Sequence, residues 1–63
     1  MNARQMIAKL TAEETTAKAP DKRRVIREER TRLTTSVRQG DADSIAHHMS
    51  EAERVLADWA GIR

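Results

Sequence analysis

A single proline and an internal glycine divide this chain into three segments of similar length. Pro20 is followed by Asp21, and Gly40 is followed by Asp41. Proline suits the first turn of a helix, because its missing N–H is not needed there. Glycine suits the left-handed position after a helix C-terminus, and Asp41 or Asp43 can cap the helix that follows. The pattern predicts three helices, at about 3–18, 21–39 and 41–60.

The third segment has the clearest helical periodicity. Its apolar residues recur at about 100° per residue and form one stripe: Ile45, Met49, Ala52, Leu56 and Trp59. Val55 and Ile62 widen this stripe, which is typical of a helix that contacts more than one neighbour. Because Trp59 closes the stripe, we expect it to be a packing or interface anchor rather than a ligand-stacking group.

The second segment has a thinner apolar stripe, formed by Ile26, Leu33 and Val37. In residues 31–37, Thr, Leu, Thr and Val alternate with Arg, Thr and Ser, in the way that the two faces of a short strand do. No second strand is visible in the sequence to pair with it, so a helix is the preferred prediction.

The first segment is the least regular of the three. Apolar residues line one side of a helix there, but Glu14 falls within the same stripe. Thr11 and Glu14 also have capping-box spacing, so a helix could begin near residue 12 instead of running through the segment. We therefore expect residues 1–19 to form either an N-terminal helix or an extension.

These features predict an all-α fold with one small domain, residues 1–63. Its main part is an antiparallel helical hairpin, about 21–39 and 41–60, because two long helices joined by a short turn must run antiparallel. The chain holds only fourteen large apolar side chains and no cysteine for a disulfide. A chain of this length rarely buries enough apolar surface to be stable alone. We therefore expect assembly into a helical bundle, with a homodimer preferred.

Several classes of function are disfavoured by what the sequence lacks. No nucleophile–base pair, Gly-rich phosphate loop or paired-carboxylate site is visible, and so short a chain encloses a water-excluding cleft with difficulty. We therefore expect no enzyme, no cofactor and no small-molecule substrate. No apolar run reaches the ~18 residues of a membrane span, and no signal peptide is visible, so we expect a cytoplasmic protein without membrane contact.

The second segment is strongly basic, with seven Lys or Arg against three Asp or Glu in residues 20–40. On a helix, five arginines form a connected strip beside the apolar stripe: Arg23, Arg24, Arg27, Arg30 and Arg38. Because guanidinium groups bind phosphate oxygens well, this arginine strip is a candidate nucleic-acid contact. The alternative is that the strip pairs with the acidic third segment, where residues 41–63 hold five acids against two arginines.

Two adjacent histidines raise the question of a metal site. His47 shares one helix face with Asp43 and Glu51, which makes a weak candidate ligand set. Arg54 also lies on that face, and a cation there disfavours a metal. The preferred prediction is that no metal is bound and that His48 lies at the edge of an interface.

The predicted function is that of a small non-catalytic interaction module, a regulator or adaptor that acts by self-association or by docking on a partner protein. The predicted interface is the apolar stripe of the third segment, at Ile45, Met49, Leu56 and Trp59. The alternative is a nucleic-acid-binding regulator that uses the arginine strip.

In length and layout the chain is similar to two groups of small bacterial helical proteins. Rop-type plasmid regulators are dimeric hairpins that contact RNA with one helix face, and the hairpin co-chaperones of type III secretion clamp a partner protein. The similarity is one of layout only. No motif specific to either group is present, so no residue role is carried over from them.

Overall fold

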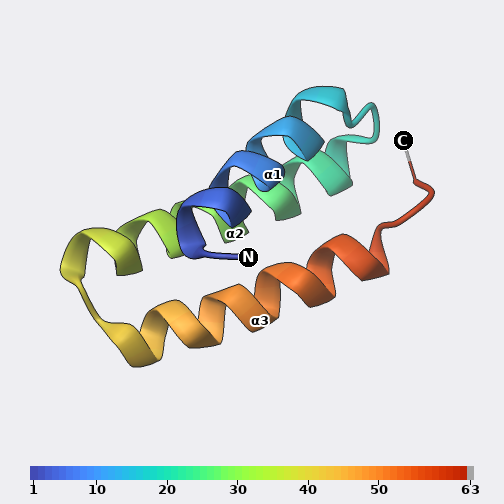
Figure 1. Ribbon diagram of the computed structural model, residues 1–63. Helices are drawn as coiled ribbons and strands as arrows, with labels where there is room; N and C mark the ends of the chain where they lie inside the picture. Colours follow the sequence, from blue (N-terminus) through green and yellow to red (C-terminus); the bar gives the residue numbers. More distant parts are fainter. Residues whose placement is uncertain (63) are drawn as a thin grey trace.

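All three helices predicted from the sequence are present. In the computed structural model, which describes residues 1–62, they are α1 (Ala3–Thr16), α2 (Pro20–Gln39) and α3 (Ala42–Asp58). Each helix runs antiparallel to the one before it, so that α1 and α3 both pack along α2 (Figure 1). No strand occurs in the described part of the chain, and the predicted all-α fold with its α2–α3 hairpin is confirmed.

The α2–α3 turn follows the capping chemistry of the sequence. Gly40 adopts the left-handed conformation, with φ 67° and ψ 24°, and its N–H donates to the carbonyls of Ser36 and Val37. Asp41, rather than Asp43, is the N-cap of α3, and its carboxylate accepts the Ser44 N–H at 3.1 Å. These contacts satisfy backbone groups that the ends of helices otherwise leave without partners.

The alternative start of a helix near residue 12 is wrong, because α1 begins at Ala3 and runs through that position. A capping box at Asn2 and Gln5 starts the helix: the Gln5 N–H donates to Asn2 Oδ1 at 2.8 Å, and the Asn2 N–H donates to Gln5 Oε1 at 2.9 Å. The hydroxyl of Thr11 donates to the Ile7 carbonyl within the same helix.

The predicted ends of two helices are slightly too late. α1 ends at Thr16, because the next residue, Ala17, already has an extended backbone. Ala19 is extended as well, as expected for a residue before proline. α3 ends at Asp58, and Trp59 is its C-cap.

The alternative of a short strand at residues 31–37 is also wrong, because this stretch lies within α2. Leu33 and Ser36 are buried at helical spacing. The hydroxyls of Thr31 and Thr34 donate to the carbonyls four residues earlier, at 3.0 and 2.8 Å. Threonine is therefore accommodated in this helix by bonding back to its own backbone.

The core is small and lies mainly between α1 and α2. Four large side chains are fully buried there: Met6, Leu10, Ile26 and Leu33. α3 adds only Ala52 to this cluster, although several of its apolar residues pack against the outside of it. The Cα radius of gyration is 11.1 Å, close to the value of about 11 Å expected for one folded domain of this length.

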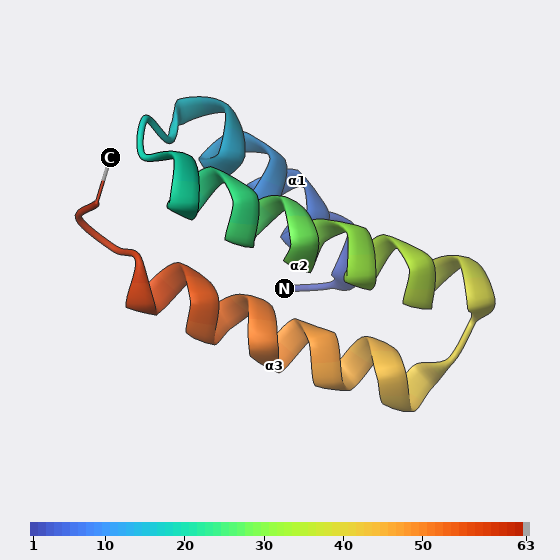
Figure 2. The same cartoon turned by 180° about the vertical axis from the view of Figure 1, so that it is seen from behind.

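α1 covers only part of the α2–α3 hairpin. It has 14 residues, whereas α2 has 20 and α3 has 17. Both views show the hairpin turn extending beyond the start of α1 (Figure 1, Figure 2). Among residues 1–62 no helix combines the length and hydropathy required to cross a bilayer.

We expect Gly40→Ala to lower the free energy of unfolding by about 1 kcal/mol, because a Cβ disfavours the left-handed conformation. A Cβ at this position would meet no other atom within 4 Å, so the effect is conformational only. Thermal unfolding followed by circular dichroism should show a midpoint about 4–8 °C lower.

Gly40→Asn is the matched comparison, because asparagine tolerates this conformation better than alanine. It should be less destabilising than Gly40→Ala. If alanine is as stable as glycine, or more stable than asparagine, the conformational explanation is wrong.

Candidate functional site

Three of the four predicted interface residues lie on the side of α3 that faces the core, and all four keep part of their surface accessible. Ile45, Met49 and Leu56 are half-buried and pack against the core. Trp59 is half-buried at the end of the helix. α3 thus differs from α1 and α2, which each bury two large side chains completely.

An apolar groove lies between α1 and α3. Its volume is about 340 Å³. Met1, Met6 and Lys9 line one wall, and Glu53, Leu56 and Ala57 line the other. Met1 is 67% exposed, so an unbranched apolar side chain is available at its rim. We call this the α1/α3 groove.

Of the predicted interface residues, only Leu56 lines the α1/α3 groove. From α1, the sequence predicts Met6 as an adaptable partner contact, whereas the contribution of Lys9 is not predicted. The sequence shows that Met6 and Lys9 lie about one turn apart on the same helix. It does not show that they form a groove with residues of α3, because those residues are more than forty positions away.

Three arginines of the strip hold α1 against α2. The guanidinium of Arg23 donates to the Ala17 carbonyl through Nε and Nη2, at 3.2 and 3.0 Å. Arg27 Nε lies 3.0 Å from Glu14 Oε2, and Arg30 Nη2 lies 3.1 Å from Glu14 Oε1. Glu14, which interrupts the apolar stripe of α1, thus bridges two arginines from the neighbouring helix.

The alternative, in which the strip pairs with the acidic third segment, is wrong for the described residues, because no ion pair of the strip reaches α3. The carboxylate that binds two of its members comes from α1, because those arginines lie on the side of α2 that faces α1. Arg24 pairs only within α2, with Asp21 at 3.6 Å, and both side chains are largely exposed. Arg38 makes no ion pair with any residue between 1 and 62.

A second groove, between α1 and α2, brings two members of the strip together. Its volume is about 370 Å³, and its lining combines two arginines with threonine hydroxyls and one apolar side chain: Ile7, Thr11, Arg30, Thr31, Thr34, Thr35 and Arg38. We call it the α1/α2 groove. Arginine suits an anion, but Arg30 is already engaged by Glu14. The hydroxyls of Thr11, Thr31 and Thr34 already donate to backbone carbonyls, which leaves Arg38 as the main free donor of the groove within residues 1–62.

Several polar side chains lie between α2 and α3, beside the apolar core. Glu29 is only 3% exposed. Its carboxylate lies 3.5 Å from His48 Nδ1 and 3.6 Å from Arg32 Nη1. The hydroxyls of Ser36 and Ser44 are hydrogen-bonded to each other at 2.7 Å. His48 therefore lies in an interface between two helices of the same chain, and the burial of Glu29 was not foreseen.

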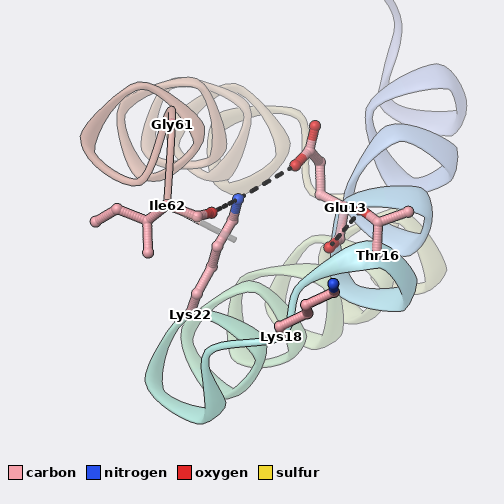
Figure 3. Close-up of a pocket in the computed structure, with 6 residues that line it drawn as sticks. All are labelled: Glu13, Thr16, Lys18, Lys22, Gly61 and Ile62. Carbon is pink, nitrogen blue, oxygen red and sulfur yellow. Dashed lines mark hydrogen bonds and ion pairs between the residues drawn. The ribbon is translucent and has the colours of Figure 1, made fainter.

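Lys22 connects three parts of the fold at the other end of the molecule. Its ammonium donates to the Ile62 carbonyl and lies 3.6 Å from Glu13 Oε2 (Figure 3). The residue is 7% exposed, although it borders a polar pocket of about 450 Å³. We interpret this pocket as a by-product of these contacts, since Lys22 and Glu13 in its lining are directed at each other.

The three candidate metal ligands, Asp43, His47 and Glu51, do not form a common site in the part of the chain that the structure describes. Glu51 accepts a hydrogen bond from Arg54 at 2.6 Å. No group of three metal-ligating side chains is found anywhere in residues 1–62, and Asp43 and His47 are both exposed. No protein-family model, curated protein or solved structure matches this chain, so its function has to be inferred from its own surfaces.

We expect Glu14→Gln to lower the free energy of unfolding by about 1 kcal/mol, because two arginines lose their carboxylate at a site only 15% exposed. Urea denaturation would measure the loss, which should shrink as salt is added.

Glu51→Gln is the matched control. It breaks a pair with Arg54 that lies within α3 and is largely exposed, so it should change stability by less than about 0.5 kcal/mol. Equal effects of the two substitutions would show that Glu14 has no special part in holding α1 to α2.

Proposed function

We propose that the protein is a small non-catalytic interaction module that docks a helix of another protein molecule along the apolar surface shared by α1 and α3. One observation carries the proposal. Every large apolar side chain of α3 remains partly exposed, and the helix buries only Ala52 completely. A helix with so regular an apolar stripe normally hides it, so an additional partner is expected on this side.

The α1/α3 groove supplies suitable contacts for a docked helix. Amphipathic helices bind by placing apolar side chains at successive turns into a groove of this kind. Leu56 lines the groove, and Met1, which is 67% exposed at its rim, provides a flexible side chain that adapts to different shapes. Lys9 and Glu53 supply charges that can orient the incoming helix.

Because α1 is shorter than α2 and α3, the part of the hairpin near its turn is not covered by α1. Beyond the start of α1, the side chains near the turn have no third helix to pack against. Val37 is 43% exposed there, and Ile45 is half-buried. An added helix longer than α1 would cover the groove and reach these residues as well.

We expect a photo-crosslinking amino acid at position 57 to give one discrete protein adduct in cells that express this chain. Ala57 is exposed and lines the α1/α3 groove, so the reactive group would lie against whatever occupies it. Gel mobility and mass spectrometry would detect the adduct.

The matched control places the same amino acid at Ala12, an exposed alanine of α1 that lines none of the grooves described above. Little or no adduct is expected from it. An absence of protein adducts at position 57, or equal yields from both positions, would contradict the proposed docking surface.

A nucleic-acid-binding regulator is the second candidate, and the α1/α2 groove favours it. The groove places Arg30 and Arg38 beside four threonines. Phosphate-backbone contacts of this kind are sequence-independent and weaken as salt rises. The candidate ranks second, because Arg27 and Arg30 already bind Glu14 of α1 and Arg23 binds the carbonyl of the α1 C-cap.

If this second function holds, Arg38→Ala should weaken binding of DNA or RNA in a mobility-shift assay at about 50 mM salt and reduce the salt slope by about 1. Arg54→Ala removes the same charge from α3 and should have a smaller effect. Failure of the unaltered protein to retain either nucleic acid at low salt would exclude this function.

A further inference from the structure

We infer that the protein that covers the α1/α3 groove is a second copy of this chain, whose own α1 and α3 face it, related to the first by a two-fold axis parallel to α1 and α3. The inference rests on the proposed function and adds to it the identity and the orientation of the partner. It is carried by the charges on the two walls of the groove.

The two walls carry opposite charges that find no ion-pair partner within residues 1–62. Lys9 lies on the α1 wall and Glu53 on the α3 wall. Both residues are exposed, and neither makes an ion pair with any described residue. The groove therefore presents a positive wall and a negative wall on either side of an apolar floor.

The positions of these two charges determine which two-fold axis is favourable for a dimer. α1 and α3 run parallel, since each is antiparallel to α2. When two grooves face each other, an axis parallel to these helices sets α1 of each copy against α3 of the other. Lys9 of one copy then meets Glu53 of the other, twice. An axis perpendicular to the helices sets α1 against α1, where equal charges repel.

The same arrangement covers the apolar side chains that the single chain leaves accessible. Two grooves placed face to face enclose Met1 and Leu56 from both copies and form a layer of four helices, with α2 on the outside. Charged residues beside an apolar seam set partner choice and orientation in such bundles.

The size of the molecule limits the strength of the dimer. A stable interface buries about 800 Å² per partner, and the whole chain exposes 4341 Å². Nearly a fifth of the surface has to be covered, so the contact must extend beyond the six residues that line the groove. We expect dissociation constants of about 1–100 μM, in which the charge pairs make a measurable contribution.

Charge exchange tests the inference. In sedimentation equilibrium, the unaltered protein should dimerise, and Lys9→Glu and Glu53→Lys should each weaken self-association about tenfold or more, because both reciprocal pairs become repulsive. An equimolar mixture of the two variants should recover dimers at least as tight as those of the unaltered protein, because both pairs are then attractive. Circular dichroism would verify that each variant is folded.

Each outcome is decisive. If the single variants dimerise as tightly as the unaltered protein, this groove or this axis is wrong. If the unaltered protein and the mixture both remain monomeric up to about 1 mM, the partner is not a second copy. In that case an adduct with a different protein at position 57 would preserve the proposed function, whereas no adduct would end both.

Discussion

One narrow apolar stripe on α2 has to serve two neighbouring helices, and the other features of the structure follow from this constraint. Ile26 and Leu33 are fully buried, but the positions on either side of them are polar except for Val25. The contacts that widen each interface are therefore polar too. On the α1 side Glu14 binds two arginines of α2. On the α3 side the polar contacts are the hydrogen-bonded pair of Ser36 and Ser44 and the pair of Glu29 with His48.

This division of the surface of α2 explains why α3 is the incompletely covered helix. Its closest approach to the core is made by Ala52, while its larger apolar side chains stand around the edge of the core. The apolar α1/α3 groove and the basic α1/α2 groove consequently lie on opposite flanks of α1. The proposed docking of a protein helix and the alternative contact with a phosphate backbone would use different surfaces, and they can be tested independently.

Local chemistry was enough to predict the hairpin, but not the partners of the charged residues. Pro20, Gly40 and Asp41 determine helix ends through their own backbone and side-chain preferences, so the sequence shows them directly. The capping box at Asn2 carries the same kind of signal and was overlooked. By contrast, the pairing of Glu14 with arginines of α2, and the meeting of Lys9 with Leu56 across a groove, depend on which faces the helices turn toward each other. That choice is made by tertiary packing.

The buried ammonium of Lys22 has a consequence for how the helices align. The last turn of α1, the first turn of α2 and the segment after α3 meet at this one atom through Glu13 and the Ile62 carbonyl. Sliding α2 by a turn would carry the ammonium about 5.4 Å from both acceptors and leave a desolvated cation unmatched, which is strongly unfavourable. Apolar side chains alone tolerate such slippage, so a single cation distinguishes the observed alignment from its nearest competitors.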